Sequence, residues 1–192
     1  QAESKGHRWG KQIFFMGIAI LGIGLFWMQK DHYKAYQQWN KAQMFYNNKA
    51  YEAALEVYEP LYPLLKHKPE FLFEAAQSLS KTGQYEKANE YLERAVLLSS
   101  DPMLYYVMAK NEQCLGEYRQ AEKHLLHAID ILPERIYPYY LLMNLYTEPS
   151  YFQPAKLKMA IDSVLTKKPK VESSAIKEMK EKARSMLNNT SI

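Results

Sequence analysis

The 192-residue chain is poor in residues that would support several common kinds of protein. It has a single cysteine, Cys114, so it cannot close an internal disulfide, and we expect that residue to be buried or half-buried. Strand-like alternation of apolar and polar residues is absent, which favours an all-α chain. The net charge of +4 is mild and spread out, without a Lys/Arg cluster of the kind that binds nucleic acid, so no nucleic-acid partner is expected.

Signatures of catalysis are also missing. The chain has no phosphate-binding glycine loop, no zinc signature and no nucleophile–base pairing that sequence alone can defend. His124 and His127 could share a metal with Asp130, but the repeat described below places them where side chains pack between layers or face solvent. We therefore expect no catalytic residue, no cofactor and no metal in this chain.

What the chain does contain is an internal repeat. Four alanines recur at intervals of 34, 33 and 34 residues, each three positions after Tyr or Phe, and a second set of alanines lies upstream of the first three. Small residues are needed where two antiparallel helices cross closely, so this period predicts stacked helical hairpins. The two sets are Ala54, Ala88, Ala121 and Ala155, and Ala42, Ala76 and Ala109.

The repeat resembles the tetratricopeptide repeat. Its best copies read Gly83-Gln84-Tyr85-x-x-Ala88 and Gly116-Glu117-Tyr118-x-x-Ala121. Glycine closes the first helix of each pair because it adopts the left-handed conformation without penalty, and the aromatic residue fills the angle between the helices. The resemblance implies an all-α solenoid of helical hairpins at 31–170, with copies at about 35–68, 69–101, 102–135 and 136–169.

The first copy departs from this motif. Lys49-Ala50-Tyr51 replaces the Gly-x-Tyr turn, and Pro60 and Pro63 fall inside the second helix. An interior proline costs about 3 kcal/mol, so we expect this helix to kink or stop near Tyr58.

One more helical pattern follows the repeats. Apolar residues share one face of the segment 171–188, and charged residues occupy the rest. This pattern predicts a capping helix that covers the end of the stack, followed by a frayed tail at 189–192. The apolar residues are Ile176, Met179, Ala183 and Met186.

An uncharged apolar run, residues 13–28, precedes the repeats. It would be about 24 Å long as a helix, short of the roughly 20 residues that usually cross a bilayer. Lys11 and Lys30 can snorkel, however, and Trp9 and Trp27 stand where interfacial aromatics would. The run therefore predicts a transmembrane helix at 12–30 after a flanking segment at 1–11; a cleaved signal peptide is the competing interpretation.

The transmembrane helix is predicted to continue into the repeats. No glycine or proline occurs between Leu25 and Glu59, so it could run directly into the first repeat helix.

The candidate site is the concave surface, which the first helix of each pair lines in this repeat type. Its wall combines aromatic rings and amides, which suit an extended peptide or a sugar ring. The alternative is that several of these tyrosines only pack against neighbouring helices. The inward-facing residues are Tyr36, Trp39 and Gln43, then Phe73 and Gln77, then Tyr106 and Lys110, then Tyr137, Tyr140 and Asn144.

A closer resemblance is to the C-terminal extension of some bacterial O-antigen ligase and polymerase family membrane proteins. It rests on the stretches 132–142 and 168–179 within 76–187, and on a membrane helix leading into the repeats. The resemblance implies a non-catalytic module, tethered to the inner membrane with its repeats in the periplasm, that binds a protein or an acceptor glycan for surface polysaccharide assembly. The alternative is a stand-alone membrane-anchored adaptor unrelated to glycans.

Overall fold

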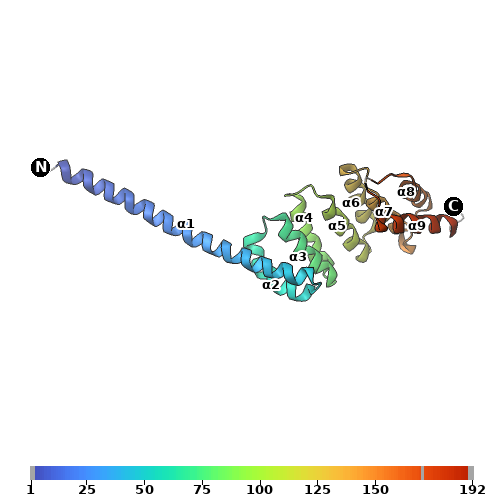
Figure 1. The fold of residues 1–192 in the computed structure, drawn as a ribbon, viewed down its shortest axis with the longest axis horizontal. Helices are drawn as coiled ribbons and strands as arrows, with labels where there is room; N and C mark the ends of the chain where they lie inside the picture. Colours follow the sequence, from blue (N-terminus) through green and yellow to red (C-terminus); the bar gives the residue numbers. More distant parts are fainter. Residues whose placement is uncertain (1–2, 170, 190–192) are drawn as a thin grey trace.

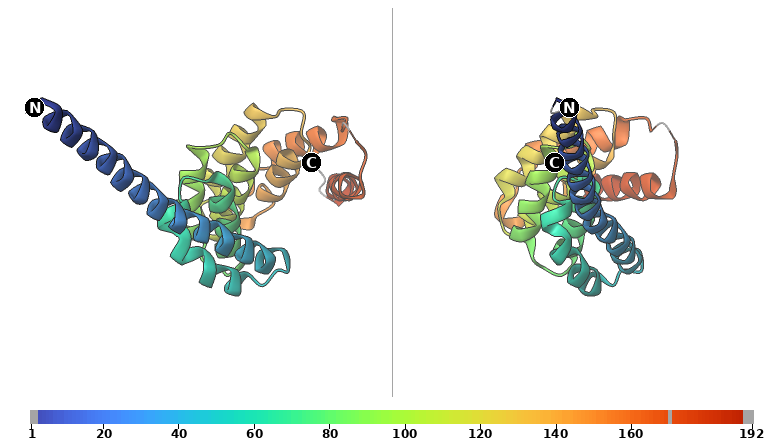
Figure 2. Two further views of the ribbon diagram at one scale, coloured as in Figure 1. Left: turned by 60° about the vertical axis from the view of Figure 1, so that its left-hand side comes forward. Right: turned by 90° about the vertical axis from the view of Figure 1, so that its left-hand side faces the viewer.

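The computed structural model describes the backbone of residues 3–169 and 171–189; the side chains at 3–13, 25–29 and 189 lie outside the described residues. The described part is helical, without strands, and forms a stack of hairpins (Figures 1 and 2). The predicted all-α, tetratricopeptide-like solenoid is thereby confirmed. Its elements are α1 (Glu3–Asn47), α2 (Tyr51–Leu65), α3 (Pro69–Lys81), α4 (Tyr85–Val96), α5 (Pro102–Cys114), α6 (Tyr118–Ile131), α7 (Tyr137–Leu145), the 3-10 helix η1 (Pro149–Tyr151), α8 (Pro154–Thr166) and α9 (Ser174–Asn189).

The direction in which the stack curves follows from which helices touch. The first helices of neighbouring hairpins contact one another: α1 lies against α3, α3 against α5, α5 against α7 and α7 against α9. The second helices, α2, α4, α6 and α8, approach their successors at most weakly. The stack therefore curves towards the first helices, which form its inner face, and opens between the second helices.

The repeated alanines lie where the helices of a hairpin cross. In the first three hairpins every alanine of both sets is completely buried, and Ala54, Ala88 and Ala121 are each the fourth residue of the second helix. The fourth hairpin breaks the series, because Ala155 is exposed and Leu157 is the fourth residue of α8, with only 1% of its surface exposed. The inserted helix η1 shifts the register of α8 by two residues.

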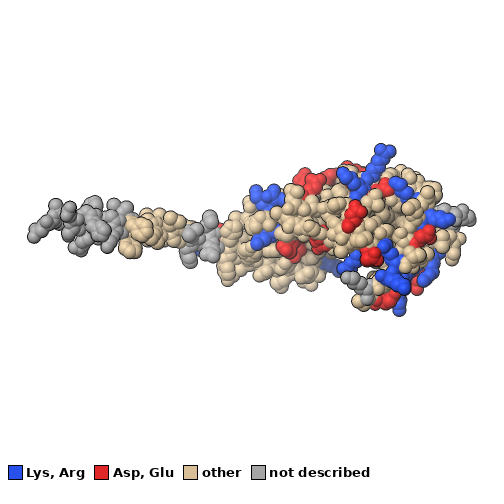
Figure 3. All heavy atoms as spheres, turned by 90° about the horizontal axis from the view of Figure 1, so that it is seen from above, with Lys and Arg blue, Asp and Glu red and all other residues tan. Residues whose placement is uncertain are grey.

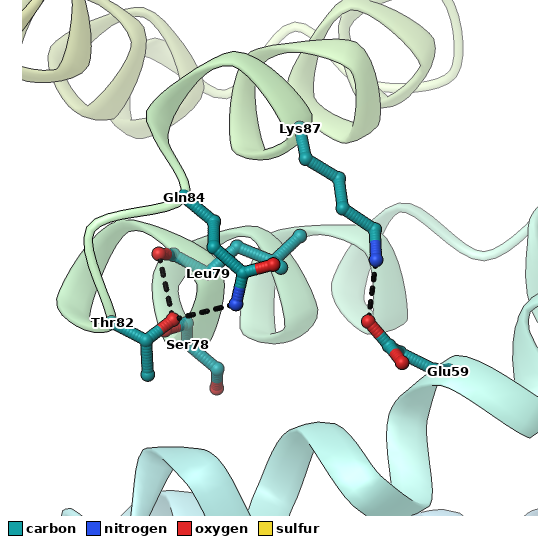
Figure 4. A network of polar contacts seen from close by, with 6 residues as sticks. All are labelled: Glu59, Ser78, Leu79, Thr82, Gln84 and Lys87. Carbon is teal, nitrogen blue, oxygen red and sulfur yellow. Dashed lines mark hydrogen bonds and ion pairs between the residues drawn. The ribbon is translucent and has the colours of Figure 1, made fainter.

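The turns inside the hairpins share one backbone conformation. Gly83 and Gly116 have φ angles of 81° and 77°, and Lys49 adopts the same left-handed conformation at 61°. Around Gly83 the hydroxyl of Thr82 lies 3.1 Å from the carbonyl of Ser78 and accepts a hydrogen bond from Gln84 (Figure 4). The left-handed conformation of these turns explains why two of them contain glycine. Lys49 adopts the same conformation although its side chain disfavours it.

The two prolines of α2 do not end it. The sequence predicts that the helix kinks or stops near Tyr58; it runs through Pro60 and Pro63 to Leu65, so it does not stop there. Both prolines are exposed, whereas Tyr58, Leu61 and Leu65 on the opposite face are buried. Burial of these three side chains offsets the lost backbone hydrogen bonds. The ion pair of Lys87 with Glu59 links this stretch to α4 (Figure 4).

The apolar segment and the first repeat helix form one element, as predicted. Helix α1 is continuous over 45 residues and projects from the stack (Figure 1). Within the described residues, no helix has the length and apolar character that a bilayer span requires. The apolar run with described side chains covers only 14–24, whereas about 20 residues are needed. The transmembrane helix predicted at 12–30 is therefore not supported; its side chains at 12, 13 and 25–29 lie outside the described residues.

Helix α9 occupies the place of the first helix of a further hairpin. It packs against α8 and also contacts α7, as α7 itself does with α6 and α5. Ala183 is fully buried, and Ile176, Met179 and Met186 pack against the core of the third and fourth hairpins. The inner face therefore extends onto α9.

The backbone strain at Lys49 leads to the first prediction. Replacing Lys49 with glycine should raise the free energy of unfolding by about 0.5–1 kcal/mol, because glycine has no Cβ to disfavour the left-handed conformation. Gly83→Ala should lower it by about 1 kcal/mol; an added Cβ there meets no atom within 4 Å, so only the backbone is affected. Urea denaturation followed by circular dichroism measures both.

The matched control is Lys66→Gly. Lys66 has a φ of −60°, so glycine there should only destabilise. Stabilisation of the chain by both lysine-to-glycine changes would contradict the assignment of strain to Lys49.

Candidate binding face

One completely buried residue in each first helix sets the register of the inner face. These residues, Ala42, Ala76, Ala109, Met143 and Ala183, are all completely buried. Residues three positions before and one position after each of them are four apart, so they share one side of the helix. The predicted groove residues occupy these positions in two rows across the stack, with Tyr36 and Tyr137 one turn earlier. The first row is Trp39, Phe73, Tyr106 and Tyr140; the second is Gln43, Gln77, Lys110 and Asn144.

At the N-terminal end of this face, a carboxylate from α3 binds two of the three predicted residues of α1. The indole nitrogen of Trp39 donates to Glu74 at 2.7 Å, and the amide of Gln43 donates to its other oxygen at 2.8 Å. The hydroxyl of Tyr58 in α2 donates to the same carboxylate at 3.1 Å. We call this set, Glu74 with Trp39, Gln43 and Tyr58, the Glu74 clasp.

The neighbouring polar groups are similarly engaged. Tyr46 donates to the amide oxygen of Gln77, and burial followed by the charge of Glu74 raises the pKa of the Tyr46 hydroxyl. The same two causes raise the pKa of Tyr58 far above its ordinary value. Both hydroxyls therefore remain donors at neutral pH, and three of the predicted residues, Trp39, Gln43 and Gln77, already have partners within the fold.

At the C-terminal end, tyrosine rings join the first helices α5 and α7, and a lysine of α9 contacts the last ring. Tyr106, 5% exposed, meets the edge of Tyr137 with centroids 5.2 Å apart, and Tyr137 stacks on Tyr140 at 6.5 Å. The amine of Lys182 in α9 lies 5.4 Å from the centroid of Tyr140. Burial raises the pKa values of Tyr106 and Tyr137, so both rings stay neutral. We call these rings the tyrosine strip.

The remaining predicted residues are more accessible. Tyr36 is 36% exposed, with the amine of Lys68 5.9 Å from its ring centroid, and Lys110 is exposed. Phe73 and Asn144 are half-buried. The inner face thus keeps accessible side chains on each of its four helices beside the groups that are engaged in internal contacts.

A second carboxylate joins the third and fourth hairpins. Tyr146 and Lys156 donate to one oxygen of Glu122 at 2.6 and 2.7 Å, and Tyr151 donates to the other at 2.7 Å. Burial acts to raise the pKa of Glu122, but these hydrogen bonds outweigh it, and the pKa lies below its ordinary value. We call this set, Glu122 with its three donors, the Glu122 clasp.

Sequence reasoning missed both clasps. The donors of Glu74 lie up to 35 residues away, and those of Glu122 up to 34. One usable signal existed: each glutamate lies within two positions of a repeat alanine that is fully buried, where a charge needs partners.

The outer side of the stack is hollowed between the second helices. A cleft of about 480 Å³ has Val96, Met108 and Leu115 among its lining residues, with four exposed glutamates around them, and a cleft of about 620 Å³ lies beside it. The four glutamates are Glu86, Glu90, Glu93 and Glu117.

The histidines considered as metal ligands also lie on this outer side. His124 lies 2.9 Å from the carboxylate of Glu112, and both His124 and His127 pack against Tyr105. In the part of the chain that the structure describes, no three residues of ligating type gather around a common point.

Cys114 is exposed at the end of α5, so the expectation that it is buried is wrong. It lies beside the Gly116 turn, where the chain leaves the packed crossing.

Comparisons with known proteins support the fold. Residues 47–128 match the sequence family described as anaphase-promoting complex, cyclosome, subunit 3, which is less than half of the chain. No curated protein matches. Among solved structures, MamA 41-end from Desulfovibrio magneticus RS-1 has a TM-score of 0.63 at 19% identity, covering 83% of this chain and 98% of its own.

Two further structures are similar. A crystal structure of MamA has a TM-score of 0.61 at 19% identity, covering 75% of this chain and 82% of its own. PcrH, solved in complex with the chaperone binding region of PopD, has a TM-score of 0.51 at 16% identity, covering 66% of this chain and 90% of its own. Together with the helix arrangement, these likenesses define the chain as a tetratricopeptide-like helical repeat domain.

The resemblance to O-antigen ligases and polymerases is wrong. Neither the matched family nor the similar structures point to such proteins. The stretch 132–142 comprises an inter-repeat loop and the first part of α7, and 168–179 comprises a loop and the first part of α9. These stretches therefore reflect the helical-repeat architecture rather than membership of that family.

The Glu74 clasp leads to the second prediction. Glu74→Ala should lower the free energy of unfolding by about 2–3 kcal/mol, because the part-buried Trp39 N–H and Tyr58 O–H groups lose their hydrogen-bond acceptor. Urea denaturation gives the stability, and a change in tryptophan emission reports the released indole. Glu70→Ala, an exposed position on the same helix, should change stability by less than about 0.5 kcal/mol. Equal effects of the two substitutions would contradict the clasp.

The Glu122 clasp leads to the third prediction, a dependence of stability on pH. The folded-state pKa lies below the ordinary value of 4.5, so Glu122 stabilises the fold above that pH. This contribution is lost as pH falls through the folded-state pKa. Glu122→Gln should lower the free energy of unfolding by about 1–2 kcal/mol at neutral pH and should flatten its decline in acid.

Urea denaturation at neutral pH and at several acidic values tests this. The control is Glu134→Gln, since Glu134 is 79% exposed and 4.0 Å from Lys167. If the free energy of unfolding of the wild type and of Glu122→Gln fell equally in acid, the Glu122 clasp would not be the source of the acid sensitivity.

Proposed function

We propose that this domain is a non-catalytic protein-binding module that holds a segment of a partner protein against its inner face. The observation that carries the proposal is the continuity of that face. Two rows of aromatic and amide or lysine side chains cross four consecutive first helices, each in contact with the next. Rigid aromatic groups with hydrogen-bonding neighbours are what an extended peptide requires.

The dimensions of the face fit a short peptide. Packed helices lie about 10 Å apart, so four first helices span roughly 30 Å. An extended chain advances about 3.3 Å per residue, so about nine residues would cross the face. PcrH, of similar fold, was solved in complex with the chaperone binding region of PopD, which supports a peptide as the occupant.

The surroundings of the rings favour a peptide over a sugar. Sugar stacking needs an open ring face, but an amine lies over Tyr36 and another over Tyr140. Trp39 is half-buried and hydrogen-bonded to Glu74. The face therefore suits contacts at ring edges and amides, as a peptide backbone makes. The location at a bacterial inner membrane, with periplasmic repeats, stays a prediction.

The fourth prediction tests the inner face directly. Random twelve-residue peptides displayed on phage are selected against the wild-type domain, and the affinities of selected peptides are measured by fluorescence anisotropy. The double variant Tyr36→Ala/Asn144→Ala should weaken binding at least about tenfold, because each truncated side chain loses contacts worth about 1 kcal/mol.

The matched control lies on the second helices. Leu98→Ala/Leu126→Ala truncates two exposed side chains after α4 and on α6 and should leave affinity unchanged. Circular dichroism should be unchanged in both variants. Peptides that respond to the control variant but not to Tyr36→Ala/Asn144→Ala would place binding elsewhere and overturn the proposal.

A further inference from the structure

The outer cleft of about 480 Å³ between α4 and α6 combines an apolar floor with acidic walls, and we call it the acidic cleft. Helix α5 packs against both α4 and α6 and supplies part of the floor, including Met108 and Leu115. The exposed glutamates from α4 lie four and three positions apart, so they share one side of that helix. They are Glu86, Glu90 and Glu93; a fourth exposed glutamate of the cleft, Glu117, directly precedes α6.

Within the described residues, no lysine or arginine neutralises these charges. The four exposed glutamates have no ion pair in this part of the chain, and neither lysine nor arginine is among the residues that line the acidic cleft. A fifth carboxylate, Glu112, lines the cleft although it is only 4% exposed. The one side-chain partner of Glu112 among the described residues is the ring nitrogen of His124 at 2.9 Å. Even a protonated His124 would leave the carboxylates of the cleft in excess.

The preceding pair of second helices shows which cation the acidic cleft lacks. Helices α2, α4 and α6 each begin on the tyrosine of the repeat, so equivalent positions follow by counting. Lys87, the third residue of α4, pairs with Glu59, the ninth residue of α2 (Figure 4). The third residue of α6 is Gln120 and the ninth residue of α4 is Glu93, and both line the acidic cleft. Glu93 therefore lacks the cation that its counterpart Glu59 has, and an amine or guanidinium from outside can supply it.

The negative charge is a property of this cleft rather than of a whole side of the molecule. On the face drawn in Figure 3, acidic and basic side chains are intermixed. The neighbouring outer cleft of about 620 Å³ has three basic residues and two carboxylates among its lining residues; they are Arg119, Lys123, Lys156, Glu122 and Asp130. On α6, Arg119 and Lys123 occupy the positions that Glu86 and Glu90 have on α4. A basic ligand is therefore favoured in the acidic cleft over its neighbour.

The distribution of the carboxylates favours a chain with several cationic groups over a single metal ion. From Glu86 to Glu93 the acidic side of α4 is about 10 Å long. In the described ranges, no three residues of ligating type gather around a common point. Apolar side chains between the carboxylates, among them Val96 and Leu115, also offer contacts that a bare ion cannot use.

We propose that the acidic cleft binds a basic segment of a partner protein, in which an apolar residue lies between lysines or arginines. One basic side chain of the segment pairs with Glu93, as Lys87 does with Glu59, and others pair with Glu86 and Glu90. The apolar side chain contacts the floor of the cleft. This site lies outside the inner face, so the inference is independent of the proposed function and adds a second binding site to it.

The fifth prediction uses Gln120→Lys, which places a cation at the position equivalent to Lys87 and so supplies the missing partner of Glu93 from within the fold. Random twelve-residue peptides displayed on phage are selected against the wild-type domain and screened for loss of binding to this variant. Peptides that bind the variant at least about tenfold more weakly, measured by fluorescence anisotropy, should be enriched in Lys and Arg with an apolar residue among them. Gln38→Lys makes the same change of charge at an exposed position of α1 and should leave their affinity unchanged.

A second pair of variants removes charge from matched positions. Glu86→Gln/Glu90→Gln should weaken these peptides about tenfold at low ionic strength, and added salt should reduce the difference. Glu52→Gln/Glu56→Gln changes the equivalent exposed positions of α2 and should leave their affinity unchanged.

Three outcomes would overturn the inference. The first is that no peptide distinguishes the wild type from Gln120→Lys, and the second is that the peptides that do so are not basic. The third is binding of spermine as tight as that of the peptides and equally sensitive to Gln120→Lys, because the cleft would then recognise charge without a chain. Tyr36→Ala/Asn144→Ala should leave the affinity of these peptides unchanged, so the acidic cleft and the inner face are tested separately.

Discussion

The rest of the structure depends on the close crossing of two helices over a pair of small residues. In the first three hairpins both crossing positions are alanine and both are fully buried. This crossing brings the backbones near enough for each hairpin to stack on the next with its first helices in contact. The fourth hairpin has Met143 and Leu157 at these positions instead, and both are almost completely buried. The size of the two side chains at the crossing therefore distinguishes the first three hairpins from the fourth.

The two carboxylate clasps fix the relative positions of the helices that pack closely over the alanines. Apolar contacts between repeats are non-directional, whereas a carboxylate that accepts from three donors fixes the geometry of every element that supplies one. Glu74 joins α3 to α1 and α2, and Glu122 joins α6 to α7, η1 and α8. The Glu122 clasp lies beside the insertion that shifts the fourth hairpin, where the alanine series no longer specifies the packing.

The sequence predicts the part of this architecture that local rules determine. Period and glycine turns predict three hairpins, because small residues at crossings and left-handed turns act within one repeat. The fourth hairpin was misjudged at Ala155, since two inserted residues in a turn change which residue is buried while leaving a similar spacing. The persistence of α2 through Pro60 and Pro63 depends on burial by neighbouring helices, and the clasps depend on partners about one repeat away. Neither can be read from one segment.

The candidate face also combines features that the local sequence determines with features that depend on distant partners. Helix register alone places the ten predicted residues in order, but only the structure separates those that tie helices together from those that face solvent. Side chains held by clasps and stacked rings lose little further freedom on binding, so more of the contact energy appears as affinity. Helix α9 continues the stack as an additional first helix, and its apolar residues Ile176, Met179, Ala183 and Met186 pack against the core of the third and fourth hairpins. A change that displaces α9 would therefore expose apolar side chains of that core and destabilise the third and fourth hairpins.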